Sequence, residues 1–161
     1  MPPVQRMGVR QFLALGGGCG DRPAKDCPLS PPLHELSMDM ARAERILIAS
    51  GVPYTIIRIG ALLPTNPNHP SAGLASGKSY LTTDLNIFGG ILRADLNREI
   101  VSCLGAERCI GKIFMADDPT VKPQLDHFLC KRRHETDTVK TFHPECGEMP
   151  PITEAQLKGM P

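Results

Sequence analysis

A helix pattern that runs directly into a strand pattern constrains this chain more than any other feature of its sequence. Apolar residues recur at helical spacing from about Leu33 to Ser50, and residues 51–53 then separate this helix from Tyr54–Ile59, which is almost entirely β-branched or aromatic. That composition is typical of a strand covered on both faces, and a short link is typical of a helix that returns to a parallel sheet. The passage therefore predicts a βαβ unit of an α/β fold.

The helix has clear expected ends and an expected buried stripe. Ser30 before Pro31 suits a helix start, and Gly51 suits a C-cap. The apolar residues that share one face are Leu36, Met40, Ala43 and Leu47. We expect this stripe to lie in the core, and the alternative is that it forms a partner-binding face.

Further strand and helix patterns lie on both sides of this unit. They are a strand at Gln11–Leu15, a short strand near Ile87–Ile91, a helix at Arg93–Leu104 and a strand at Lys112–Ala116. Their alternation predicts a partial doubly wound parallel sheet in residues 1–119, followed by an irregular C-terminal extension at 120–161. Because so few strands leave a sheet edge open, we expect a protein partner or a missing N-terminal segment to complete the sheet.

Composition narrows the class of protein. The chain has 161 residues, 41% of them hydrophobic and 22% charged, with a net charge of +1. These values predict one globular domain without the basic field that recruits nucleic acid, and no apolar run is long enough to span a membrane. The start lacks a secretory signal, and no Asn-x-Ser/Thr sequon occurs. We therefore expect an intracellular chain, cytoplasmic or organellar, whose six cysteines are reduced thiols.

The run from Asp39 to Arg58 resembles the helix-to-strand passage of atypical short-chain dehydrogenase/reductases, especially the NmrA-like and biliverdin-reductase-B-like NAD(P)-binding proteins. In that group the helix carries a Glu, a Ser-Gly turn follows, and an aromatic-Thr-Ile strand ends in Arg. The segments 8–13, 91–96 and 111–114 resemble the flanking pieces in the same order. The resemblance implies the carboxyl-terminal half of a Rossmann-like fold.

The resemblance also implies a cofactor, NADP or NAD, at the carboxyl ends of the strands. The positions of this half that would hold its nicotinamide side are Gly16, Gly17, Met40, Ile59 and Gly60. The glycine-rich turn that binds the pyrophosphate would precede residue 1.

The sequence departs from the group where proton chemistry takes place. The group has a Ser at the first strand end, where this chain has Gly16 and Gly17, and Tyr-x-x-x-Lys on the helix, where it has Leu36 and Met40. The hydroxyl, phenol and ammonium that would polarise a carbonyl are thus absent, and no catalytic residue is predicted. Two functions stay open: an NAD(P)-binding oxidoreductase-like protein that is incomplete as a catalyst, or a catalytically silent structural or regulatory subunit.

Two glycine-containing motifs do not support other functions. The cluster Gly16–Gly20 misses the glycine spacing of a dinucleotide-binding turn and is followed by prolines rather than a helix. The glycines around Ser76 miss the spacing of a serine-hydrolase nucleophile elbow by one residue.

Several charged and metal-ligating side chains have a structural and a functional interpretation. We expect Asp95 to cap its own helix rather than to act in catalysis beside Arg93. Arg58 is expected to contact either a ligand or a buried carboxylate. The tail contains His127, Cys130, His134, His143 and Cys146. Their spacing matches no standard zinc pattern, so no metal site is predicted.

Overall fold

The computed structural model describes residues 6–133 and 146–158, which contain six strands. The strands are β1 (Phe12–Gly17), β2 (Tyr54–Ile59), β3 (Ala61–Leu63), β4 (Tyr80–Thr82), β5 (Gly90–Leu92) and β6 (Lys112–Asp117). The main sheet has the order β1-β2-β6-β4, in which β1, β2 and β6 are parallel and β4 is antiparallel to β6. β3 and β5 form a separate parallel pair.

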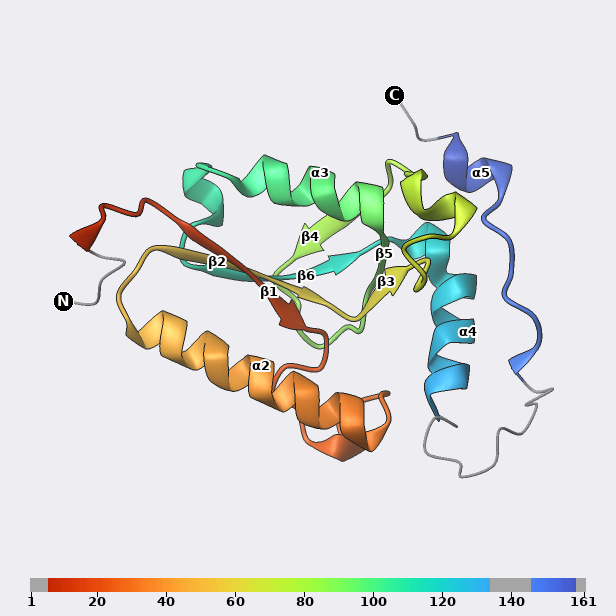
Figure 1. Cartoon of the computed structure of the whole chain (residues 1–161), viewed down its shortest axis with the longest axis horizontal. Helices are drawn as coiled ribbons and strands as arrows, with labels where there is room; N and C mark the ends of the chain where they lie inside the picture. Colours follow the sequence, from red (N-terminus) through yellow and green to blue (C-terminus); the bar gives the residue numbers. More distant parts are fainter. Residues whose placement is uncertain (1–5, 134–145, 159–161) are drawn as a thin grey trace.

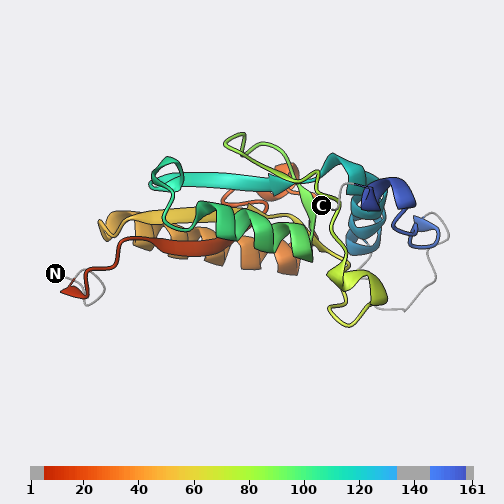
Figure 2. The same cartoon turned by 90° about the horizontal axis from the view of Figure 1, so that it is seen from above.

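Helices cover both faces of the main sheet. The α-helices in the described part of the chain are α2 (Pro31–Ala49), α3 (Arg93–Cys103), α4 (Lys122–Arg133) and α5 (Glu154–Leu157). α2 and α3 lie on opposite faces, while α4 stands at the end of the sheet beside β3 (Figures 1 and 2). Within the described ranges, no helix combines the length and apolar character that crossing a bilayer requires.

This architecture confirms the expected α/β class and the parallel order of the three long strands. The short strand expected near Ile87–Ile91 is β5, but it pairs with β3 rather than with the main sheet. β3 and β4, each three residues long, were not expected.

The termini of α2 agree with the sequence. Ser30 is the N-cap and Pro31 the first helical residue. The chain turns at Gly51, whose φ of 73° lies in the left-handed region that a glycine adopts without a steric penalty. β2 begins three residues later, as the expected short link requires.

The prediction that the apolar stripe of α2 is buried is wrong. Leu36 is 55% exposed, Ala43 is also exposed, and Met40 and Leu47 are only half-buried. The residues of α2 that are buried against the sheet are instead Ser37, Ala41 and Glu44. The helix is turned by about one residue because small Ala41 allows a close approach and Glu44 reaches a buried arginine of β2, described below. The apolar stripe therefore flanks the contact with the sheet.

The buried residues of the two hydrophobic clusters come from elements other than β1, although Leu13 of β1 packs against one cluster. One joins the sheet to α3 and contains Ile57, Ile91, Leu96 and Ala116. The other joins the β3–β5 pair to α4 and contains Ala61, Leu63, Leu92, Val121, Leu125 and Phe128. Burial of these side chains is the main stabilising term available to the fold.

The region after residue 120 differs from the irregular extension that we expected, because α4 and α5 form there. Leu125 and Phe128 of α4 belong to the second cluster. Gln124 of α4 donates to the backbone oxygens of Pro150 and Pro151 and accepts a hydrogen bond from Gln156 of α5. The C-terminal segment is thus fastened to α4, and a domain boundary at residue 119 stays a prediction.

The expectation of reduced cysteines is contradicted. The six cysteines form three disulfides, which are Cys19–Cys27, Cys103–Cys109 and Cys130–Cys146. Their Cα–Cα distances of 5.4–5.6 Å lie within the range that a disulfide spans. The cysteines appear scattered in the sequence, and only the turns between elements bring them together.

Candidate functional site

All five residues expected to hold the cofactor line one hollow. Gly16 and Gly17 end β1, Ile59 ends β2 with Gly60 after it, and Met40 approaches from α2. We call this the strand-end hollow; its volume is about 270 Å³. The remaining lining residues are Leu15, Gly18, Leu29, Leu33, Leu36, Ser37 and Phe128. It lies at the carboxyl ends of parallel strands, where open α/β sheets bind their ligands.

The first strand end is glycine because neighbouring side chains occupy the space beside it. A Cβ on Gly16 would overlap Glu44 Oε1, and a Cβ on Gly17 would lie 2.7 Å from Ser37 Oγ. Both distances are closer than a carbon atom tolerates. The serine that the resemblance implies at this strand end therefore does not fit this chain without rearrangement of α2.

A buried ion pair lies beneath this strand end. Arg58 Nη2 donates to Glu44 Oε2 at 2.6 Å, and Arg58 Nε donates to both carboxylate oxygens at 3.2 Å. The side chains of Arg58 and Glu44 are only 12% and 6% exposed. Of the two expected partners of Arg58, the structure shows the buried carboxylate. A pair buried to this extent depends on both members, because an unpaired buried charge is costly.

The loop after β1 closes one side of the hollow. Arg22 donates from Nη2 to Gly18 O at 2.7 Å, from Nε to Cys19 O at 3.2 Å and from Nη1 to Asn86 O at 2.9 Å. Burial and the nearby charge of Arg58 lower the pKa of Arg22, although a guanidinium remains charged. The disulfide between Cys19 and Cys27 closes the same loop.

Ser37 and Phe128 are lining residues that sequence reasoning missed. Ser37 Oγ donates to Gly20 O at 3.2 Å, so its hydroxyl keeps an acceptor position at the hollow. Phe128 belongs to α4, in a region expected to be irregular. Ser37 directly follows Leu36, the position where the resemblance implies a tyrosine. Among the described residues that line the hollow, Ser37 is the one with a hydroxyl group.

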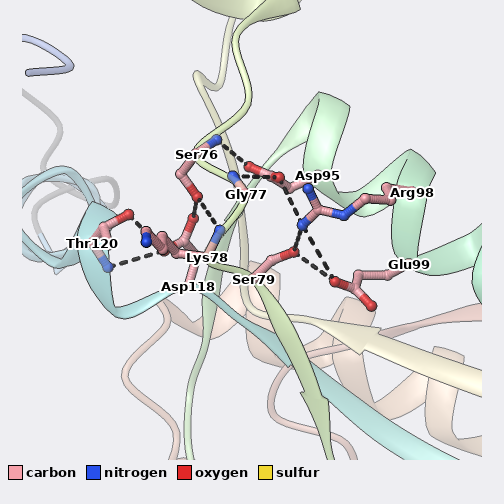
Figure 3. A network of polar contacts seen from close by, with 9 residues as sticks. All are labelled: Ser76, Gly77, Lys78, Ser79, Asp95, Arg98, Glu99, Asp118 and Thr120. Atoms are coloured by element: carbon pink, nitrogen blue, oxygen red, sulfur yellow. Dashed lines mark hydrogen bonds and ion pairs between the residues drawn. The ribbon is translucent and has the colours of Figure 1, made fainter. Parts of the chain in front are cut away.

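Asp95 has a different role from the one expected. Its carboxylate does not cap α3 but accepts the backbone N–H groups of Ser76 at 2.7 Å and Gly77 at 3.1 Å (Figure 3). Arg98 of α3 pairs with it at 3.0 Å. Asp95 therefore attaches the loop before β4 to the start of α3, which is a structural function.

Asp118 completes the same polar network at the end of β6. It accepts hydrogen bonds from the Ser76 hydroxyl and from Thr120, at 3.0 Å from the backbone nitrogen and 2.6 Å from the hydroxyl (Figure 3). Ser76 is fully buried. The buried Ser76 hydroxyl is engaged by Asp118, so it has a structural function. Arg93, the other residue considered for catalysis, donates to the backbone oxygens of Pro64 and Thr65.

The His and Cys residues of the tail do not assemble a metal centre in the described part of the chain. Cys130 and Cys146 are bonded to each other, and a ring nitrogen of His127 lies 3.0 Å from Cys146 O. His134 and His143 fall outside the described residues.

A larger hollow of about 510 Å³ lies elsewhere, between the loop after β3 and the segment 149–152. None of the five expected cofactor residues lines it. The strand-end hollow is smaller, but it is the stronger candidate because it lies at the carboxyl ends of the parallel strands.

Comparison with known proteins places this geometry in a fold family. No protein-family model and no curated protein matches the sequence. Among solved structures, ChuY, described as an anaerobillin reductase from Escherichia coli O157:H7, matches with a TM-score of 0.55 and 20% identity over 71% of this chain and 53% of that chain. A protein from Bacillus halodurans described as an NAD-dependent epimerase/dehydratase matches with a TM-score of 0.55 and 20% identity over 71% of this chain and 49% of that chain.

The chain has a partial Rossmann-like fold of the kind found in these reductase and epimerase structures. A second ChuY structure, from Escherichia coli CFT073, agrees, with a TM-score of 0.53 and 22% identity over 71% of this chain and 60% of that chain. The chain spans about half the length of the solved structures that it matches. The likeness confirms the expected partial Rossmann-like fold.

Proposed function

We propose that this chain forms the nicotinamide side of an NAD(P)-binding, oxidoreductase-like protein. The observation that carries the proposal is that the five expected positions, drawn from β1, α2 and β2, line one hollow at the carboxyl ends of parallel strands. The hollow is mainly apolar, and Ser37 supplies a hydroxyl. An apolar wall with one polar group suits the flat nicotinamide ring and its carboxamide.

Calorimetric titration with nicotinamide mononucleotide, 5′-AMP and NADPH tests this proposal. The proposal expects saturable binding of nicotinamide mononucleotide and NADPH and none of 5′-AMP, since the adenine side belongs to the other half of the fold. At a concentration one hundred times its dissociation constant, a ligand raises the free energy of unfolding by about 2.7 kcal/mol. No heat of binding and no thermal shift at millimolar ligand would contradict the proposal.

A pair of variants on one helix locates the binding. Leu36 lines the hollow and is 55% exposed, whereas Ile46 is 72% exposed and lies outside the hollow. Leu36→Trp should fill the hollow and weaken nicotinamide mononucleotide binding by at least about tenfold, or 1.4 kcal/mol. Ile46→Trp should leave the affinity unchanged. Equal effects of the two substitutions would place binding somewhere other than the hollow.

The second candidate function, a catalytically silent structural or regulatory subunit, is favoured by one observation. Glu44 and Ser37 occupy the space where the related reductases have a catalytic serine. On this account the chain transfers no hydride and serves as a structural or regulatory part of a larger assembly. Binding of NADPH without its oxidation, in the presence of a tetrapyrrole and a quinone as trial acceptors, would favour the silent subunit, and oxidation of either mixture would favour the enzyme.

We also propose that the open edge of β1 is completed by a segment of N-terminal reductase type, whether from a preceding stretch of chain or from a partner protein. β1 stands at the edge of the sheet, and Phe12 and Leu15 on it are 44% and 45% exposed. A groove of about 390 Å³ lies between β1 and α2, lined partly by Ala43 and Leu47 of the unburied stripe. A strand flanked by a helix matches this shape. An in-frame sequence before Met1 that encodes a strand, a glycine-rich turn and a helix would supply the segment.

We also propose an intracellular location for this chain. Microscopy of a fluorescent fusion to the full chain tests it, and accumulation of the fusion in a secretory compartment or in the medium would contradict it.

A further inference from the structure

The disulfide between Cys19 and Cys27 holds a wall of the strand-end hollow, and this position has a chemical consequence. Gly18 and Leu29, which flank the disulfide-closed loop in sequence, both line the hollow. Cys19 is fully buried and Cys27 is 8% exposed. The state of this disulfide therefore acts on the shape of the hollow rather than on a remote part of the surface.

In the described part of the chain, side chains rather than backbone hydrogen bonds join the loop to other elements. Within the described residues its backbone hydrogen bonds are local turns, such as those from Arg22 N to Cys19 O and from Cys27 N to Ala24 O. Its links to other elements come from side chains. Arg22 donates to Asn86 O and Ile87 O, and Ser37 of α2 donates to Gly20 O. A ring nitrogen of His34 lies 2.8 Å from Arg22 O, and Arg45 pairs with Asp21 at 3.6 Å. A loop with so few long-range backbone contacts loses much of its restraint when a covalent cross-link opens.

The disulfide between Cys103 and Cys109 provides an internal comparison. It connects the end of α3 to the turn before β6, at the amino-terminal ends of the parallel strands, whereas the strand-end hollow lies at their carboxyl ends. No residue adjacent to either cysteine of that pair lines the hollow, whereas Gly18, adjacent to Cys19, does. The two disulfides close loops of similar length, with sequence separations of 8 and 6, but they act at opposite ends of the sheet.

We propose that the Cys19–Cys27 disulfide is a thiol-responsive clasp that regulates access to the strand-end hollow; its regulatory meaning rests on the function proposed above. A thiolate of a cellular dithiol attacks the sulfur of Cys27, the less buried residue, and releases the Cys19 thiolate, which takes up a proton. The second thiol of the reductant then displaces Cys27 from the mixed disulfide. Two electrons and two protons reach the protein, and the reductant becomes a disulfide.

The reduced loop leaves its position, so the wall formed by Gly18 and Leu29 loosens and the hollow is no longer pre-shaped for a ring. A pre-shaped site binds more tightly because less conformational entropy is lost on binding.

Hydrogen-exchange mass spectrometry of the full chain tests the clasp directly. The Cys19→Ser/Cys27→Ser double variant should exchange faster in residues 18–29 than the unmodified protein. It should also bind nicotinamide mononucleotide at least about threefold more weakly. The matched Cys103→Ser/Cys109→Ser double variant should show neither change. Treatment of the unmodified protein with dithiothreitol, followed by alkylation and peptide mapping, should reproduce the effect and needs no folded variant.

The outcomes separate the clasp from the proposed function. Unchanged exchange of residues 18–29 after verified reduction of Cys19–Cys27 would overturn the clasp, and so would an equal effect from the Cys103–Cys109 control. If neither redox form binds the mononucleotide but exchange still changes in 18–29, the clasp stands as a structural device and the proposed cofactor function fails.

Discussion

The face of the main sheet under α3 and the face under α2 bury different kinds of side chain. Beneath α3, Ile57 and Leu96 pack in a continuous apolar cluster. Beneath α2, the buried helix residues are Ser37, Ala41 and Glu44, while the larger apolar side chains of the helix remain outside the contact. The α3 face is a closed core, whereas the α2 face and the neighbouring β1 edge keep apolar surface available for another segment.

One face of a doubly wound sheet can therefore be well packed while the other face resembles an interface. Exposed apolar groups concentrated beside an unpaired edge mark interaction sites more often than isolated exposed residues do.

Removal of the buried carboxylate should have the largest effect. Glu44→Ala leaves Arg58 buried without its partner, and we expect the free energy of unfolding to fall by about 3–5 kcal/mol. Urea denaturation measures this change. Asp39→Ala on the same helix is the control, because its pair with Arg42 is exposed and should contribute about 0–1 kcal/mol. Similar losses from both variants would mean that the pair beneath α2 does not hold the helix in place.

Deletion of one methyl group should lower the free energy of unfolding more on the α3 face than on α2, although the difference is smaller than for Glu44→Ala. Ile57→Val in the α3 cluster should cost about 0.5–1.5 kcal/mol, because the methyl group leaves a fully packed site. Ile46→Val on the exposed side of α2 should change stability by less than about 0.5 kcal/mol in the isolated chain. Equal costs measured by denaturation would show that α2 is already covered in solution.

A small pH effect is expected at the opposite sheet edge, on β4. The Tyr80 hydroxyl donates to Asp117 at 3.0 Å, and this hydrogen bond, with partial burial and the negative charges of Asp117 and Asp84, raises the pKa of Tyr80. The stabilisation is present below the ordinary tyrosine pKa and is lost as pH rises through the raised value. Asp117→Ala should lower the pKa of Tyr80 toward the ordinary value.

Tyrosinate absorbance in a Tyr54→Phe background measures this pKa, because the chain has two tyrosines. An identical titration curve with and without Asp117 would show that the carboxylate does not act on Tyr80 in solution.

The sequence predicted most of the fold because local patterns and element order carry that information. The passage from α2 to β2 fixed the βαβ unit, and the resemblance located the strand ends that line the hollow. The rotation of α2 was not predictable, since it depends on a contact between Glu44 and Arg58, which lie 14 residues apart in sequence. Cysteine pairing and the role of Phe128 likewise follow only from tertiary contacts.

Amide hydrogen exchange along β1, followed by NMR, tests the contrast between the closed and open sides most directly. Phe12 donates its N–H to Pro53 O, so by the alternation of a strand the amides of Leu13 and Leu15 point to the free edge, whereas that of Ala14 points to β2. We expect Leu13 and Leu15 to exchange at least about tenfold faster than Ala14 in the isolated chain. Equal protection of all three amides would show that the β1 edge is already paired and would contradict the account.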